Sequence, residues 1–329
     1  MKCLVTSARP YDRAFLEKAN DNRHELFFVE SRLDRSTVSL ARGFPAVCPF
    51  VDDRLDAECV RVLFEGGTRI LALRSTGYNN VDLDAARSSG MTVMRVREYS
   101  PFAVAEFALG LMLVLNRHIH RAYNRVREGN FLLDGFLGFD MHGRTAGIVG
   151  TGKIGTALAR ILSGMGCRIL GFDARPSPAC LSLGMEYRPL GSLLAESDIV
   201  SLHLPLQPET RHIIDREALD RMKPTAMLVN TSRGGLIDSA ALVDALKARK
   251  IGAVGLDVYE EEAGLYFRDH GEENIDDDVF ARLLTFSNVV VTGHQAYFTR
   301  DAMEEIARTT LSNLDDFEAS RKNDNTVCP

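Results

Sequence analysis

Short apolar runs alternate with amphipathic segments through residues 1–100. The runs have the length of β-strands, and they cover residues 2–6, 25–29, 46–50, 69–73 and 92–96. Between them, residues 53–64 and 81–88 repeat apolar positions at the spacing of a helix. This alternation predicts an α/β domain built on a mostly parallel sheet.

A long helical pattern begins at Ser100-Pro101 and continues to about residue 128. Serine caps free N–H groups at a helix start, proline suits the first helical position, and Gly129-Asn130 predicts the end. The first half of the pattern is apolar on nearly every side. We therefore expect this helix to be buried between layers or between subunits.

A second series of strands and helices follows. Its predicted strands cover residues 145–149, 167–172, 198–202, 226–230, 252–258 and 288–292. Its helical segments cover residues 153–164, 215–222, 238–249 and 277–284. Elements in this order predict a doubly wound parallel sheet. The last helical pattern, residues 299–319, follows the final strand, and we expect it to return to the first domain.

A glycine-rich loop joins the strand predicted at residues 145–149 to the next helix. The loop consists of Gly150, Thr151, Gly152, Lys153, Ile154 and Gly155. Glycines at this G-x-G-x-x-G spacing permit a tight turn, a close approach of a pyrophosphate and close packing of helix on strand. The free N–H groups at the helix start then bind the phosphates. In this context the loop predicts a dinucleotide site rather than a plain turn.

The residue at the end of the next predicted strand bears on the choice of dinucleotide. Asp173 stands there, and an acidic side chain at this place binds the ribose hydroxyls and repels a 2′-phosphate. NAD is therefore the expected cofactor. Arg175 is close in sequence and is able to pair with a phosphate, so NADP stays open as the alternative.

The place of the glycine-rich loop in the chain predicts a nested domain organisation. Because the loop lies far from the start of the chain, we expect residues 101–297 to form an NAD domain inserted into a substrate domain of residues 1–100 and 298–329. Both are predicted to be Rossmann-like or flavodoxin-like α/β domains. Ligand sites occur preferentially at domain interfaces, so we expect the substrate cleft there.

Polar residues follow three late strands of the predicted NAD domain. Arg233 follows one strand, Asp257 and the acidic run 260–262 follow the next, and His294 follows the last. In an open parallel sheet, the carboxyl ends of the strands face the ligand crevice. An arginine there binds the carboxylate of a 2-keto acid, and a histidine protonates the carbonyl oxygen. A neighbouring carboxylate, Glu262 or Asp257, would favour the protonated histidine.

Each of these positions also has a structural interpretation. An arginine at a strand end is often a solvated charge, a histidine after a strand is often structural or exposed, and an acidic run is typical of a surface loop. The other histidines show no metal-like spacing, and no metal site is expected. No motif of a nucleophilic serine or cysteine is present.

Composition narrows the function classes. Hydrophobic residues make up 45% and charged residues 26%, which is typical of a globular chain. Lys and Arg total 39 against 45 Asp and Glu, and a formal charge of −6 without a basic run argues against a nucleic-acid partner. The longest apolar stretch, residues 107–115, is far shorter than the about 20 residues that span a membrane. The six cysteines show no paired spacing, so free thiols and a cytoplasmic location are expected.

Several segments together resemble the D-isomer-specific 2-hydroxyacid dehydrogenases, and within that family the chain looks like the fermentative D-lactate dehydrogenases of bacteria. The segments are LRSTGYNNVDL (73–83), YSPFAVAEF (99–107), TAGIVGTGKIG (145–155), NTSRGGLID (230–238), GLDVYEEE (255–262) and TGHQAY (292–297). They span nearly the whole chain and are specific in combination. The resemblance implies a reversible, NADH-dependent reduction of pyruvate to D-lactate without a metal.

The resemblance also implies a role for individual residues. Arg233 would bind the substrate carboxylate and polarise its carbonyl, His294 would be the acid/base, and Glu262 its carboxylate partner. In the first domain, the backbone N–H groups of Thr76 and Gly77 would also bind the carboxylate. The resemblance implies two further substrate contacts, Tyr99 and Tyr297. It also implies cofactor contacts at Pro205, Thr231 and Asp257.

The subgroup and the substrate rest on fewer residues. Tyr99 and the long loop after Glu262 look like the lactate group, and Ala263 stands where phosphoglycerate and glycerate dehydrogenases typically have proline. A bulkier acid, such as 2-ketoisocaproate or phenylpyruvate, stays an alternative substrate. A remote alternative is an NAD-sensing binding protein of the corepressor type, which shares this fold and catalytic trio.

The resemblance bears on assembly as well. The family associates through the region of the long apolar helix, so a homodimer or homotetramer is expected. Phe107 in this helix departs from the histidine that the family often has there, which affects subunit packing more than chemistry.

Overall fold

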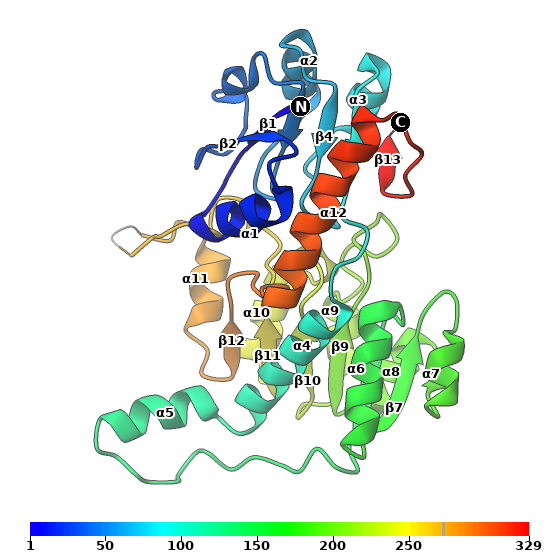
Figure 1. Cartoon of the computed structure of the whole chain (residues 1–329). Coiled ribbons are helices and arrows are strands. Elements are labelled where there is room, and N and C mark those ends of the chain that lie inside the picture. Colours follow the sequence, from blue (N-terminus) through cyan, green and yellow to red (C-terminus); the bar gives the residue numbers. More distant parts are fainter. Residues whose placement is uncertain (272–273, 329) are drawn as a thin grey trace. The chain divides into compact units, whose positions relative to one another are not determined.

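The chain forms two compact α/β units in this computed structural model, which describes residues 1–271 and 274–328 (Figure 1). Of the described residues, 1–100 and 298–328 form one unit, and 101–271 and 274–297 form the other. Residue 329, the last of the predicted substrate domain, lies outside the described residues. Strands alternate with helices in both units, which confirms the predicted fold class.

The first unit contains a six-stranded sheet in the order β13-β5-β4-β3-β1-β2. Its strands are β1 (Lys2–Val5), β2 (Glu25–Phe28), β3 (Ala46–Cys48), β4 (Ile70–Ala72), β5 (Thr92–Met94) and β13 (Thr326–Cys328). The first five pair in parallel in the flavodoxin-like order, and β13 adds an antiparallel edge strand next to β5. The sequence pattern predicted the five parallel strands but not β13, which is short.

The α-helices of the first unit begin at side-chain caps or at proline. They are α1 (Pro10–Asn20), the 3-10 turn η1 (Val38–Ala41), α2 (Ala57–Glu65), α3 (Leu83–Ser89) and α12 (Arg300–Glu318). The carboxylates of Asp56 and Asp82 accept the N–H groups of the first turns of α2 and α3, and the Thr299 hydroxyl does so for α12. The last helix, α12, packs beside α1 (Figure 1).

Two buried charges fix the loops that follow β1 and β3. Asp53 is fully buried, and its carboxylate accepts the hydroxyls of Thr6 (2.7 Å) and Ser7 (2.8 Å) and two backbone N–H groups. Arg74, directly after β4, is also buried and donates to the carbonyl oxygens of Thr6, Ser7 and Cys48. The segment Thr6-Ser7 is therefore held between a carboxylate and a guanidinium.

The second unit contains a fully parallel seven-stranded sheet in the order β12-β11-β10-β9-β6-β7-β8. Its strands are β6 (Thr145–Val149), β7 (Arg168–Phe172), β8 (Glu186–Tyr187), β9 (Ile199–Leu202), β10 (Met227–Asn230), β11 (Ala253–Leu256) and β12 (Val289–Val291). The strand order reverses between β6 and β9, as in a doubly wound sheet. The sequence pattern predicted all of these strands except the two-residue β8.

The helices of the second unit flank this sheet, except α5, which contacts α4 and has no buried residue. They are α4 (Pro101–Asn116), α5 (Ile119–Arg127), α6 (Lys153–Gly164), α7 (Pro178–Ser182), α8 (Leu190–Glu196), α9 (Arg216–Arg221), η2 (Gly234–Leu236), α10 (Ser239–Lys247) and α11 (Asp278–Leu284). Helix α4 packs against α6, β10 and β11, and Leu111, Met112 and Leu115 are buried in this contact. Much of the apolar character of α4 is thus explained within its own unit.

The prediction of one continuous helix to about residue 128 is wrong. Helix α4 ends at Asn116, and α5 begins at Ile119 after a bend of 57°. The Asn116 side chain bonds both backbone groups of Phe139 (2.8 and 2.9 Å), and His118 adopts a left-handed φ of 52°. Tertiary hydrogen bonds therefore end the helix where its sequence pattern continues. By length and composition, no single helix of the described part suffices to cross a membrane, and only the bent pair α4 and α5 passes that test together.

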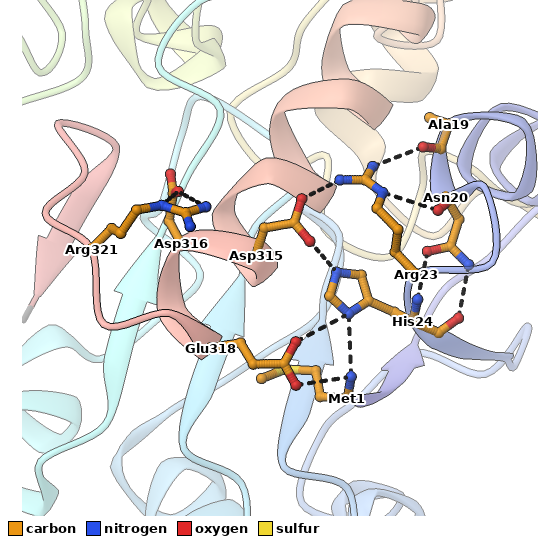
Figure 2. A network of polar contacts seen from close by, with 9 residues as sticks. All are labelled: Met1, Ala19, Asn20, Arg23, His24, Asp315, Asp316, Glu318 and Arg321. Carbon is orange, nitrogen blue, oxygen red and sulfur yellow. Dashed lines mark hydrogen bonds and ion pairs between the residues drawn. The ribbon is translucent and has the colours of Figure 1, made fainter.

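A polar cluster ties the N-terminus and β2 to the end of α12 (Figure 2). His24 has a side chain only 1% exposed, and its Nε2 lies 3.0 Å from a carboxylate oxygen of Asp315. Its Nδ1 lies 3.3 Å from the Met1 amine and 4.0 Å from Glu318. Burial, assisted by the Met1 ammonium group, lowers the pKa of His24, and the two carboxylates oppose this only in part.

This lowered pKa predicts a loss of stability in mild acid. An unfolded histidine titrates near pH 6.5, so below about that pH the unfolded chain binds this proton more readily than the folded chain does. The free energy of unfolding should therefore fall as the pH drops through this range. In urea unfolding at pH 7.5 and pH 5.5, we expect His24→Gln to lose less stability than the wild type between the two conditions.

The matched control is His142→Gln, at an exposed histidine of the second unit. Its pH dependence should follow that of the wild type. Equal losses for His24→Gln and the wild type would contradict the assignment of the acid sensitivity to His24.

Candidate active site

Three of the predicted functional residues follow adjacent strands of the second sheet. Arg233 comes after β10, Asp257 directly after β11 and His294 after β12. Because these strands are parallel neighbours, their carboxyl ends lie at one edge of the sheet. The structure therefore brings the loops that carry these side chains together, as the strand pattern predicts.

His294 and Glu262 form a hydrogen-bonded pair. The Nδ1 atom of His294 lies 3.0 Å from Oε1 of Glu262, and the other carboxylate oxygen accepts the backbone N–H of Tyr259 (3.1 Å). An ionised carboxylate only accepts, so Nδ1 carries the proton of this bond. The side chains are 18% and 26% exposed, and Nε2 of His294 has no hydrogen-bond partner among the described residues. One ring nitrogen is thus held while the other stays available to a ligand.

Asp257 has a different role from Glu262. It is fully buried, and its carboxylate accepts the hydroxyl of Thr292 (2.6 Å) and the N–H groups of Gln295 (2.9 Å) and Ala296 (2.8 Å). Burial raises the pKa of Asp257, although these hydrogen bonds oppose the shift. Of the two carboxylates that the sequence left open as partners of His294, Glu262 contacts the ring and Asp257 fixes its loop.

The Arg233 loop is fixed by its neighbours but leaves its guanidinium available. The Asn230 side chain donates to the carbonyl of Arg233 (2.9 Å) and accepts the N–H of Ser232 (3.0 Å). A Cβ atom on Gly234 would collide with the backbone at Tyr259, so only glycine permits this close approach to the loop that carries Glu262. Within the described part of the chain, the guanidinium bonds only the carbonyl of Ser232.

Asn230 is a supporting residue that the sequence analysis did not single out. The only signal in the sequence is an amide at the end of a buried strand, shortly before the arginine. Such a residue is recognised only when its backbone partners are known, because an asparagine at a strand end has many other uses.

The glycine-rich loop has the geometry that a dinucleotide requires. Gly150 has a φ of 98°, and a Cβ atom there would lie 2.5 Å from the carbonyl oxygen of His203 after β9. A Cβ atom on Gly155 would collide with the carbonyl of Gly150, whereas one on Gly152, at the start of α6, would meet nothing within 4 Å. The first and third glycines are thus required by packing, and the second leaves open space where a phosphate approaches.

The other predicted cofactor residues follow strands of the same sheet. Asp173 follows β7, and its carboxylate accepts the backbone N–H of Thr151 (2.6 Å). Pro205 lies on the loop after β9, and Thr231 follows β10, where its buried hydroxyl has no hydrogen-bond partner in the described part of the chain. An open glycine cradle and a buried hydroxyl without a partner both fit a bound dinucleotide. Burial lowers the pKa of His203, beside the cradle, to about 4, so its ring is neutral.

The predicted substrate residues of the first unit lie on two loops. Thr76 and Gly77 follow β4, and their backbone N–H groups have no acceptor among the described residues. Tyr99 follows β5, and Tyr297, in the second unit, lies with its ring centroid 6.4 Å from that of His294. Across residues 1–271 and 274–328, no group of three or more His, Cys, Asp or Glu is arranged to hold a metal ion.

Comparisons with known proteins agree with this geometry. Residues 109–296 match the family described as D-isomer specific 2-hydroxyacid dehydrogenase, NAD binding domain. The D-lactate dehydrogenase of Escherichia coli (strain K12) is 50% identical over 319 residues, which cover 97% of this chain and 97% of that protein.

Two solved structures extend the comparison to the fold. The pyruvate reductase of Chlamydomonas reinhardtii has a TM-score of 0.92 at 44% identity and covers 98% of this chain and 97% of its own. A D-2-hydroxyisocaproate dehydrogenase has a TM-score of 0.85 at 30% identity over 100% of both chains. These relatives are named as enzymes, which sets aside the binding-protein alternative. The chain therefore belongs to the D-isomer-specific 2-hydroxyacid dehydrogenases and is an NAD-dependent enzyme.

Proposed function

We propose that this enzyme reduces pyruvate to D-lactate reversibly, with His294 as the acid/base and Arg233 as the carboxylate-binding residue. The observation that carries this proposal is the His294–Glu262 hydrogen bond, which leaves Nε2 free at the sheet edge that also bears Arg233 and the glycine-rich loop. This combination of an acid, an anion-binding arginine and a dinucleotide cradle suits hydride transfer to a keto acid.

The residues of this chain act on the substrate at two points. The guanidinium of Arg233 binds the carboxylate, and Nε2 of His294 donates a proton to the carbonyl oxygen. NADH, when bound, supplies the hydride that the carbonyl carbon accepts. The proton on oxygen and the hydride on carbon together convert the ketone to the secondary alcohol, and the reverse reaction returns the proton to His294.

Glu262 prepares His294 for this proton transfer. Its carboxylate holds Nδ1–H and so fixes the tautomer and orientation of the ring. Asp257 supports the same ring indirectly, since it holds the N–H groups of Gln295 and Ala296 just after His294.

The preferred substrate follows from the degree of similarity to named relatives. The chain shares 50% identity with a D-lactate dehydrogenase but 30% with a D-2-hydroxyisocaproate dehydrogenase. This supports pyruvate over a bulkier acid. The substrate contacts at Thr76, Gly77, Tyr99 and Tyr297, and the cofactor contacts at Asp173, Pro205 and Thr231, are part of the proposal.

A panel of keto acids tests the substrate. We expect the highest kcat/KM for pyruvate, with lower values for 2-ketobutyrate, 2-ketoisocaproate, phenylpyruvate, glyoxylate and hydroxypyruvate, measured as NADH oxidation. The product should be D-lactate by chiral chromatography. A preference for the branched or aromatic acids would overturn the choice of pyruvate and leave the reaction class intact.

Substitutions test the residue roles. His294→Ala should lower kcat by roughly 10²–10⁴-fold because no other group supplies the proton. Arg233→Ala should remove most turnover, and Glu262→Gln should lower kcat. The affinity of these two variants for NADH, measured by fluorescence titration, should stay near that of the wild type.

The control for the histidine is His142→Ala. This exposed residue precedes β6, at the opposite end of that strand from the glycine-rich loop, and its loss should leave turnover unchanged. Near-wild-type kcat in His294→Ala would refute the proposed acid/base role.

We propose further that the enzyme assembles as a homodimer or homotetramer through an apolar arm, defined as α5 and the loop to residue 138. No residue of α5 is buried, yet the arm is ordered by its own contacts. Arg125 lies 3.8 Å over the ring of Phe136 and donates to two loop carbonyls. Leu133 (81% exposed) and Leu137 (94% exposed) meanwhile face solvent. Exposed apolar side chains on such an arm are typical of a protein–protein contact, and a second copy is the occupant we propose.

Charges on the arm should therefore dissociate the assembly. We expect Leu133→Asp combined with Leu137→Asp to shift the mass measured by sedimentation velocity to that of the monomer, because each carboxylate would be buried without a partner. Leu181→Asp, at another exposed leucine (53%) on α7, should leave the mass unchanged. An unaltered oligomer in the double variant, or a monomeric wild type, would exclude the arm as the contact.

A cytoplasmic location completes the proposal. All six cysteines are buried free thiols. Reducing compartments maintain thiols in this state, whereas secreted proteins more often carry disulfides. Fractionation of cells that produce the enzyme would test this location.

A further inference from the structure

Two consecutive peptide groups after β4 have occupied carbonyls and unoccupied N–H groups. The carbonyl of Ser75 accepts the N–H of Val96 (3.0 Å), and the carbonyl of Thr76 accepts Nη1 of Arg95 (3.0 Å). The N–H groups of these same two peptides belong to Thr76 and Gly77, and neither has an acceptor among the described residues. The loop thus presents two adjacent N–H donors. The carbonyl of each of the two peptides is bonded by a residue just after β5.

Because the peptide bond is planar, the hydrogen bonds to these two carbonyls also fix the directions of the two N–H groups. In a trans peptide, the C=O and N–H bonds point in opposite directions. Fixing the Thr76 carbonyl on Arg95 therefore aims the N–H of Gly77 away from Arg95. A charged donor on the carbonyl also polarises the peptide and strengthens its N–H as a donor. Val96 orients the neighbouring peptide in the same way, but without a charge.

Arg95 is itself held in place from three sides. Its guanidinium lies over the ring of Tyr78, 5.1 Å from the centroid. Its backbone N–H donates to the carbonyl of Asn325, and its carbonyl accepts the side chain of the fully buried Asn313 (both 3.0 Å). No carboxylate within residues 1–271 and 274–328 forms an ion pair with it, so its charge is not neutralised nearby. This fixed cation lies at the carbonyl end of the peptide that carries the N–H of Gly77.

We infer that Arg95 is a positioning residue for the substrate carboxylate. It acts through the Thr76–Gly77 peptide, which it aims and polarises, and it adds a positive charge behind that peptide. This inference rests on the proposed reduction of a 2-keto acid, because it assigns Thr76 and Gly77 to the carboxylate of that substrate. Arg95 makes no direct contact with the substrate in this role, in contrast to Arg233.

The test compares Arg95→Met, Arg95→Gln and Arg95→Lys in steady-state kinetics. Methionine removes both the charge and the hydrogen-bond donor, and glutamine keeps a donor without the charge. Lysine keeps the charge and a donor but lacks the planar guanidinium group. We expect KM for pyruvate to rise roughly tenfold or more in Arg95→Met, with kcat changed much less. The values of KM should increase in the order wild type, Lys, Gln, Met. The dissociation constant of NADH should not change.

A substrate without a carboxylate separates positioning from a general structural effect. Methyl pyruvate has the same ketone but no negative charge, so Arg95→Met should lower kcat/KM for pyruvate and leave that for methyl pyruvate nearly unchanged. Equal losses for both substrates would overturn the inference. If Arg95→Met does not fold, the same comparison between Arg95→Gln and Arg95→Lys decides the question.

Arg69 provides the matched control. It stands at the other end of β4, donates to the carbonyls of Phe64 and Thr68 (both 2.9 Å) and lies 4.2 Å over the ring of Phe64. Arg69→Met removes similar contacts away from the Thr76–Gly77 loop, and its KM for pyruvate should equal that of the wild type. A wild type that does not reduce pyruvate would refute the proposed function, whereas an active wild type with unchanged KM in Arg95→Met would refute only the role of Arg95.

Discussion

Parallel strand pairing is the constraint on which both units depend. All strands of the second sheet and the first five of the other run in one direction, so the loops that leave their carboxyl ends collect at one edge of each sheet. The central strands β9 and β10 of the second sheet are buried throughout. The side chains proposed to act on the ligand lie on the loops that follow the strands. Arg233, Asp257 and His294 share one sheet edge for this reason, although they are far apart in sequence.

A loop at such an edge needs further support before it positions a side chain. Both units provide it with buried polar side chains that bond backbone groups or hydroxyls of the loops. Asp257 holds the segment after His294, and Asn230 holds the segment around Arg233. In the first unit, Asp53 and Arg74 hold the two sides of the segment after β1. Each of these bonds joins two groups of the protein itself, which is the kind of support that electrostatic preorganisation requires.

The sequence was most informative where local pattern and local structure coincide. The strands of both sheets and the glycine-rich loop depend on periodicity and on glycine, and their positions were predicted within a few residues. The break after Asn116 and the strands β8 and β13 were missed, because each depends on partners that are distant in sequence. Arg95 shows the same limit, since an arginine after a strand becomes informative only when its acceptor, the Thr76 carbonyl, is known. Motifs therefore predict which groups meet the ligand, and tertiary contacts decide which groups hold them.

The two carboxylates near His294 show how burial assigns roles to chemically similar groups. Asp257 is fully buried, and its carboxylate oxygens accept three donors that fix the loop after β12. Glu262 is partly exposed and uses one oxygen for the backbone and one for the ring. A change of charge on His294 is therefore felt directly by Glu262, while Asp257 keeps the backbone in place throughout. The same division separates Arg233, whose guanidinium is open to a ligand, from Arg74, whose guanidinium is used by backbone carbonyls.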